Sequence, residues 1–360
     1  MKLAFLLLAA LCAGSAPKLQ AAIEGVIDTR VAGASQELIV VNQQLWYLTA
    51  SGKIIIYNTQ GGKQTIPSVQ AVIARHIAND GKDVIAQMGT KLQRWNSSTS
   101  TWQELGVLPV PVFALAANSE HRVYAITPKG VWDISQNTFH LPTSSPNSQI
   151  RPGKAFSAPD TYFMDAQDNL WLGYGYGEWG GNIFTYSTKA SQFVALNFNN
   201  FPITLSPIKS FFQLKKEVGV SSGLQHMMNN GAIATFHHFS AQAVYSSDKD
   251  IDITSQESRW KSINELPYIG PATYEAESEQ IYFYANKGVF KGKAGSDLSK
   301  LRNWQLVFTP KLHWRNGQRD AVGSPMNVLK MLSLGGGKLA LLTQDDGVGI
   351  WDGTSFRLLP

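Results

Sequence analysis

Cysteine is nearly missing from this chain of 360 residues, whose single cysteine is Cys12. Cys12 lies in an N-terminal stretch that has Lys2, then an apolar run over 3–11, then small residues, which is typical of a secretory signal peptide. We therefore predict a signal peptide over residues 1–22 and a mature protein that is periplasmic or secreted. Without cysteine, the mature protein has no disulfides, so its stability must come from a packed core.

Charged side chains and long apolar runs are also scarce. Lys, Arg, Asp and Glu make up 16% of the chain, and the formal net charge is only +5. So small a basic excess argues against a nucleic-acid-binding protein. No stretch after the signal peptide is long and apolar enough for a membrane helix, so we expect no membrane span. The sequence also lacks a nucleophile elbow, a zinc motif and a phosphate-binding loop, so we expect no cofactor and no bound metal.

Glycine turns between short strands of alternating polarity are what the sequence has in abundance. Pairs of such strands flank a turn at 45–57, 84–95, 123–132, 281–290 and 339–351. An apolar strand precedes each pair and an aromatic-containing strand follows it, which gives four strands per unit. These units recur about every 40–50 residues, a period typical of propeller blades.

We therefore predict an all-β fold: a β-propeller, with seven four-stranded blades, that forms a single domain over residues 23–360. The fifth unit, at about 206–266, is the least regular. Each sheet alone would leave both faces bare, so the units must pack into a closed ring. A two-sheet sandwich of similar strands is the alternative, and it explains the spacing less well.

The clearest unit lies at residues 168–186. It combines an acidic turn at Asp168, Leu-Trp-Leu-Gly at 170–173, and a glycine pair at 180–181 ahead of Tyr186. In this order the residues resemble the repeat of two-component regulator propellers, although extra residues follow the Leu-Trp-Leu-Gly run and the other units keep only fragments. The resemblance implies the propeller fold. In that family such propellers are sensor ectodomains joined to a membrane helix and a kinase, neither of which this chain shows, so the resemblance says little about its role.

One face of the propeller is expected to carry the binding site. In this fold the loops between the second and third strands and the connectors between blades share a face, called the loop-rich face below, and a rigid scaffold holds them. In this chain they carry aromatic rings beside cations, which suits an anionic or sugar-like ligand. The candidate ligand-binding residues are Tyr174, Tyr176, Glu178, Trp179, Arg151, His226, His313, Trp314 and Arg315. The structural alternative is that the tyrosines pack their loop down and the arginines are solvated.

Three histidines raise the alternative of a metal site. His226 falls in the fifth unit together with the adjacent pair His237 and His238. Adjacent residues of a strand point to opposite faces, so the pair is not expected to hold one ion, and we predict no metal site. Asp165 and Asp168 occupy hairpin positions where aspartate commonly caps turns, and we predict that role for them.

These observations favour a ligand- or partner-binding module that acts through the loop-rich face without turnover. Its partner would be a glycan, an anionic small molecule or an envelope protein. One alternative is a polysaccharide lyase or glycoside hydrolase acting on an anionic glycan, and another is a structural subunit of an envelope complex. In an enzyme, Glu178, His226 and His313 should converge on one pocket, whereas a binder should lack a buried acid–base pair. The sequence leaves enzyme and binder both open.

Overall fold

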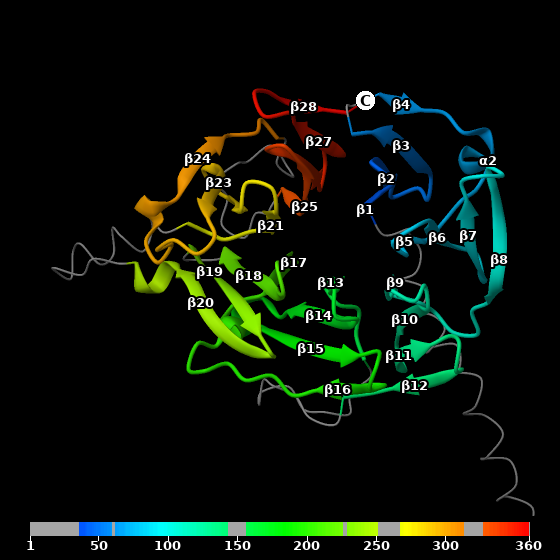
Figure 1. Cartoon of the computed structure of the whole chain (residues 1–360), viewed down its shortest axis with the longest axis horizontal. Helices are drawn as coiled ribbons and strands as arrows, with labels where there is room; N and C mark the ends of the chain where they lie inside the picture. Colours follow the sequence, from blue (N-terminus) through cyan, green and yellow to red (C-terminus); the bar gives the residue numbers. More distant parts are fainter. Residues whose placement is uncertain are drawn as a thin grey trace, which may run out of the picture.

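Seven four-stranded antiparallel sheets form a ring in the computed structural model of this chain (Figure 1). The structure describes residues 36–59, 62–142, 156–225, 229–250, 267–312 and 327–359. Each sheet is built from four strands that are consecutive along the chain, and the first of the four lies nearest the ring centre. The predicted all-β, seven-bladed propeller is therefore confirmed.

The first four blades span the N-terminal half of the described chain. Blade 1 contains β1 (Glu37–Val41), β2 (Gln44–Leu48), β3 (Ile54–Asn58) and β4 (Lys63–Gln64). Blade 2 contains β5 (His76–Asn79), β6 (Val84–Met88), β7 (Lys91–Asn96) and β8 (Thr101–Val107). Blade 3 contains β9 (Ala114–Ala117), β10 (Val123–Thr127), β11 (Gly130–Asp133) and β12 (Thr138–His140). Blade 4 contains β13 (Thr161–Met164), β14 (Asn169–Gly175), β15 (Gly181–Ser187) and β16 (Gln192–Val194).

The remaining three blades complete the ring. Blade 5 contains β17 (Ile208–Leu214), β18 (Glu217–Gln225), β19 (Asn229–His237) and β20 (Ser240–Ser246). Blade 6 contains β21 (Ala272–Glu275), β22 (Gln280–Ala285), β23 (Gly288–Lys293) and β24 (Gln305–Phe308). Blade 7 contains β25 (Val328–Gly335), β26 (Lys338–Thr343), β27 (Val348–Trp351) and β28 (Phe356–Leu358). The short helices are α2 (Pro67–Gln70), η1 (Gly177–Trp179), η2 (Ile203–Leu205), η3 (Ser247–Lys249) and η4 (Leu301–Asn303).

Blade 5 has an irregular strand register. Strands β18 and β19 are nine residues each, and their paired residues run from Val218 with Phe236 to Gln225 with Asn229. The register shifts between Ile208 and Ser210, where β17 pairs with β18, and between Ile233 and Ala234, where β19 pairs with β20. The irregularity predicted for this unit from the sequence therefore has a counterpart in its register.

The ring closes through side-chain packing between the first and last blades. Strand β1 belongs to blade 1 and β28 to blade 7, so these two blades share no strand. Instead, Leu38 and Leu45 of blade 1 share one apolar cluster with Leu342 and Ile350 of blade 7. Apolar burial of this kind, at about 25 cal/mol per Å2, is what holds the closure together.

Glycine is required at the turn into β11 because neighbouring backbone lies close. Gly130 begins β11 with φ +107°, and a Cβ atom there would lie 2.2 Å from the carbonyl oxygen of His140. Any other residue would be strained in this conformation and would also push strand β12 away from β11. Gly288 occupies the same position in blade 6, where a Cβ atom would lie 2.3 Å from the carbonyl oxygen of Phe308, so both turns need glycine for packing.

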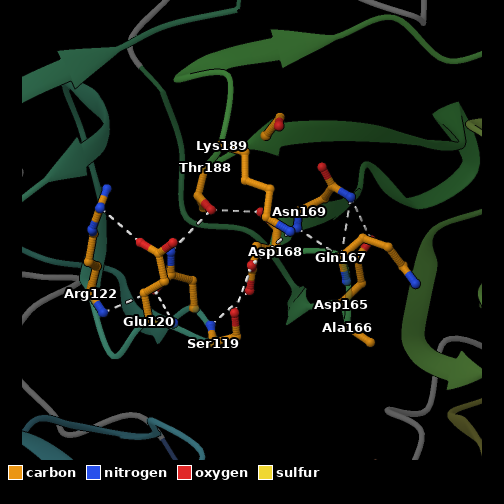
Figure 2. A network of polar contacts seen from close by, with 12 residues as sticks. Ser119, Glu120, Arg122, Asp165, Ala166, Gln167, Asp168, Asn169, Thr188 and Lys189 are labelled. Atoms are coloured by element: carbon orange, nitrogen blue, oxygen red, sulfur yellow. Dashed lines mark hydrogen bonds and ion pairs between the residues drawn. The ribbon is translucent and has the colours of Figure 1, made fainter.

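The acidic residues of blade 4 hold its first turn. Asp165 accepts hydrogen bonds from the backbone N–H groups of Gln167 and Asn169, both at 2.8 Å, and from the buried indole N–H of Trp171 at 2.8 Å. The predicted turn-capping role of Asp165, beside Gln167 and Asn169, is confirmed (Figure 2). The Trp of the Leu-Trp-Leu-Gly motif also donates to this carboxylate.

Asp168 instead joins blade 4 to blade 3. It adopts φ +66° and accepts hydrogen bonds from the backbone N–H and the hydroxyl of Ser119, both at 2.8 Å (Figure 2). Lys189 Nζ lies 3.2 Å from the same carboxylate. Burial alone would raise the pKa of Asp168, but these hydrogen bonds and the lysine charge together lower it.

Within the described part of the chain, no helix has the length and apolar character to cross a membrane.

Candidate functional site

The inner strands of the propeller begin at its loop-rich face. In blade 4, Thr161 at the start of β13 pairs with Gly173 near the end of β14. Strand β14 then runs into the loop that leads to β15, where Gly175 pairs with Gly181. Because all blades repeat this antiparallel order, the first residues of every inner strand lie at the loop-rich end of the central channel.

A cavity of about 890 Å3 lies along the inner strands. Strands β1, β13, β17, β21 and β25 provide most of its lining. Among the described residues, blade 2 contributes only Asn79 and blade 3 contributes none. The cavity therefore occupies the side of the channel that is lined by blades 1, 4, 5, 6 and 7.

The charges of this cavity gather at its loop-rich end. Four charged residues line it within the described chain, and each lies just before an inner strand or within its first three residues: Glu37, Asp160, Lys209 and Lys330. The structure thus brings together residues that are up to 293 positions apart along the chain.

Glu37 and His76 together connect four blades at this level of the channel. The Oε1 atom of Glu37 lies 2.9 Å from His76 Nδ1 of blade 2, and its Oε2 atom accepts the backbone N–H of Ile77 at 2.5 Å. The hydroxyl of Tyr162, from blade 4, donates to Oε1 at 3.4 Å across the channel. The other ring nitrogen of His76 lies 3.0 Å from the carbonyl oxygen of Val112, which leads into blade 3.

These contacts show where the protons of the Glu37–His76 pair lie. A carbonyl oxygen only accepts, so His76 Nε2 carries a proton toward Val112. A second proton must lie between Nδ1 and the Glu37 carboxylate, because two acceptors would otherwise face each other at 2.9 Å. Whichever atom holds that proton, the pair has no net charge. Both ring nitrogens are occupied, so His76 is not free to accept a proton from a ligand.

The two lysines are the positively charged residues that line the cavity within the described chain. Burial lowers the pKa of Lys330, although the charge of Glu37 opposes the shift. Burial also lowers the pKa of Lys209, with Asp160 acting in the opposite direction. Among the residues that the structure describes, no ion pair joins either ammonium group to a carboxylate. Lys209 Nζ lies 5.7 Å from the ring centre of Tyr268, which gives it a cation–π contact.

The candidate loop of blade 4 has a buried part and an exposed part. Tyr174 is 3% exposed and stacks on the partly buried Tyr176, with ring centres 6.4 Å apart. Glu178 and Trp179 lie in η1, and Trp179 is 71% exposed. Gly177, at the start of η1, lines the cavity, so the exposed part of this loop stands at the cavity mouth. A ligand-binding role for these four residues stays a prediction.

The loop that carries Trp179 contacts the backbone of η2. A Cβ atom on Gly180 would lie 2.6 Å from the carbonyl oxygen of Thr204, so the loop rests directly on η2. Leu205, at the end of η2, is 69% exposed. The other candidate residues are outside the described residues: Arg151, His226, His313, Trp314 and Arg315.

The histidine pair differs from its prediction. His237 ends β19, whereas His238 has φ +47° and lies in the following turn. The centres of their rings therefore lie 4.1 Å apart. The prediction that the two side chains point to opposite faces of a strand was wrong for this pair. No three His, Cys, Asp or Glu side chains come together as metal ligands within the described ranges.

Sequence reasoning missed Glu37, His76, Lys209 and Lys330 because it looked for the site in loops alone. A weak signal was present: Lys209 and Lys330 each interrupt an otherwise apolar inner strand, in Ile-Lys-Ser-Phe-Phe and Val-Leu-Lys-Met-Leu. Charged residues in such strands need a structural or a functional reason.

Comparisons with known proteins support the fold. No family model matches the chain, and no curated protein matches it. The structure of U3-55K matches with a TM-score of 0.52 at 11% identity, over 87% of this chain and 90% of that one. The hydrazine synthase of Kuenenia stuttgartiensis matches with a TM-score of 0.53 at 8% identity, over 87% of this chain and 94% of that one. Identities this low show a shared propeller fold and nothing of function.

The resemblance to two-component regulator propellers is supported at the level of the fold. The extracellular domain of a hybrid two-component system from B. thetaiotaomicron matches at 10% identity and a TM-score of 0.31, over 88% of this chain and 51% of that one. At that score the match carries no argument about a sensor role. The chain is a seven-bladed propeller, a fold that serves as a binding module in general.

Proposed function

We propose that this protein is a binding module that holds an anionic ligand at the loop-rich end of its central channel. The observation that carries the proposal is the pair Lys209 and Lys330, which line one cavity with no ion pair to a described acid. A charged group removed from water without a counter-ion costs free energy. An anion bound at the loop-rich end, which both lysines line, offsets that cost, and its binding is strengthened by the low local dielectric.

The hydrogen bonds of His76 favour a binding function over acid–base catalysis. A lyase or hydrolase needs a base with a free nitrogen or oxygen within reach of the substrate. Both nitrogens of His76 are occupied by protein groups, and Glu37 already faces three donors. The buried pair therefore supports the channel wall, which is the behaviour expected of a recognition site.

The proposal also includes a ligand contact at the rim of the cavity and a cellular location. Trp179 presents an exposed apolar face beside the cavity mouth, and Trp179→Ala tests whether the ligand reaches it. The signal peptide predicted over residues 1–22 would place the protein in the periplasm or outside the cell, where a small anion is a suitable ligand.

A binding screen tests the function directly. The mature protein is titrated calorimetrically with acetate, a longer carboxylate, inorganic phosphate, sulfate and a uronic-acid oligosaccharide. The matched variants are Lys209→Met and Lys330→Met, with the exposed Lys63→Met of β4 as the control. We expect saturable binding of at least one anion, at least tenfold weaker in each channel variant and unchanged in Lys63→Met. Absence of binding to every anion, or equal binding by all four proteins, would overturn the proposal.

A further inference from the structure

The lining of the cavity changes character along the channel axis. Its four charged residues lie at the loop-rich end, as described above. Farther along the inner strands no charged residue of the described chain lines it. The lining there includes apolar residues from four blades: Ile39, Val40, Phe163, Phe211, Met331 and Leu332. One end of the cavity is therefore charged and the remainder is apolar with neutral polar groups.

The cavity is also elongated. It follows β17 from Ile208 to Gln213 and β25 from Val328 to Ser333. At a rise of about 3.3 Å per residue, each of these runs is roughly 17 Å long. A compact inorganic anion would occupy only the charged end and would leave the apolar length unfilled.

The charge balance at the loop-rich end fits a single negative charge. The Glu37–His76 pair has no net charge, as its contacts require. Lys209 and Lys330 contribute two positive charges and Asp160 one negative charge, which leaves an excess of +1. A carboxylate carries one negative charge, whereas a phosphate monoester carries about −1.5 to −2 at neutral pH.

We propose that the ligand is an elongated amphiphilic monoanion, an alkyl or arylalkyl carboxylate. Its carboxylate lies at the loop-rich end of the cavity, which Lys209 and Lys330 line, and its apolar body runs along the channel past Val40 and Leu332. This inference rests on the proposed function, because it requires the lysine pair to bind an anion, and it adds the shape and polarity of the rest of the ligand.

A chain-length series tests the inference. The mature protein is titrated with acetate, hexanoate, octanoate, decanoate and dodecanoate, each below its micelle-forming concentration. We expect Kd to fall roughly three- to fourfold for each added methylene until the apolar length is filled. Lys330→Met should weaken every member at least tenfold. The near-isosteric Val40→Thr should weaken decanoate several-fold and leave hexanoate within twofold, because only the longer chain reaches Val40.

A cationic amphiphile distinguishes recognition of the negative charge from recognition of the apolar tail. Dodecyltrimethylammonium has the same tail and the opposite charge, and we expect at least tenfold weaker binding than for dodecanoate. Lysine-dependent binding whose Kd does not change with chain length would overturn the amphiphile and leave the anion site in place. Failure of all carboxylates to bind, in a protein that also binds no other anion, would overturn both. Equal binding of the cationic and anionic amphiphiles would show that the tail alone is recognised and would overturn the lysine assignment.

Discussion

His76 on β5 faces Glu37 on β1 at 2.9 Å, and together these two residues join adjacent blades at the centre of the ring. The second ring nitrogen of His76 reaches the Val112 carbonyl, so one imidazole connects three consecutive blades. Buried acid–base pairs in a cleft often signal catalysis. Here every polar side-chain atom of the pair has a hydrogen-bond partner within the protein. This indicates a structural role for the pair in the cavity wall.

Replacing His76 with leucine should destabilise the protein. The change keeps most of the side-chain volume but removes both hydrogen bonds and leaves the carboxylate of Glu37 buried without its partner. We expect the free energy of unfolding to fall by about 3–5 kcal/mol in urea titrations at neutral pH. His237→Leu is the control, because that side chain is 59% exposed, and it should change stability by less than about 0.5 kcal/mol. Similar losses in both variants would contradict the assigned role.

Replacing Lys330 with methionine should have the opposite effect on stability. Burial lowers the folded-state pKa of Lys330, so the unfolded chain holds its proton more tightly than the folded one. The protonated lysine therefore lowers stability at neutral pH. That penalty disappears as pH rises through the lowered folded-state pKa toward the ordinary value of 10.5.

We therefore expect Lys330→Met to gain about 1 kcal/mol at neutral pH while anion binding is lost. Thermal unfolding across a range of pH, together with the calorimetric titration, measures both effects. The gain should shrink at alkaline pH, where the natural protein has also lost the charge. A loss of stability at neutral pH would show that a favourable partner of Lys330 is present in the folded protein.

Asp168 should matter to stability through the junction of blades 3 and 4. Asp168→Ala leaves the backbone N–H and the hydroxyl of Ser119 without their acceptor and places alanine at φ +66°. We expect a loss of about 2–4 kcal/mol in the free energy of unfolding. Lys189→Met removes only an exposed partner of the same carboxylate and should cost less than about 0.5 kcal/mol.

The contribution of Asp168 should also depend on pH. Its folded-state pKa is below the ordinary value of 3.8, so the stability it adds is present above that value. It is lost as pH falls through the lowered folded-state pKa. Acid titration of unfolding should therefore show a smaller difference between the natural protein and Asp168→Ala at the lowest pH. A difference that does not change with pH would assign the effect to backbone strain alone.

The indole N–H of Trp171 can be tested by a matched pair of substitutions. Trp171→Phe removes the donor at 2.8 Å from Asp165 and leaves most of the ring. Trp46→Phe removes the same atoms from another buried tryptophan whose N–H has no hydrogen-bond partner among the described residues. Because the volume change is the same, the difference between the two variants isolates the hydrogen bond.

We expect Trp171→Phe to lose about 1.5–3 kcal/mol more than Trp46→Phe, since the acceptor is a buried carboxylate. Chemical denaturation of both variants measures the difference. Equal losses would mean that Asp165 holds its turn through the Gln167 and Asn169 backbone contacts alone.

The amino-acid sequence by itself determined the repeating unit of this protein. Alternating strands, a glycine at each tight turn such as Gly130, and the Asp165 cap are local features, and residues a few positions apart create them. Local patterns repeated seven times were enough to predict the blades, their number and their closure into a ring.

Only the tertiary structure decided which side chains meet at the centre. Glu37 and Tyr162 are 125 positions apart, and Glu37 and Lys330 are near opposite ends of the chain, so no pattern within one blade relates them. They meet because ring closure brings blade 7 back beside blade 1 and places the inner strands around one central channel. Burial, which that closure creates, also lowers the pKa of Lys209 and of Lys330, an effect that depends on the surroundings of each side chain in the folded ring.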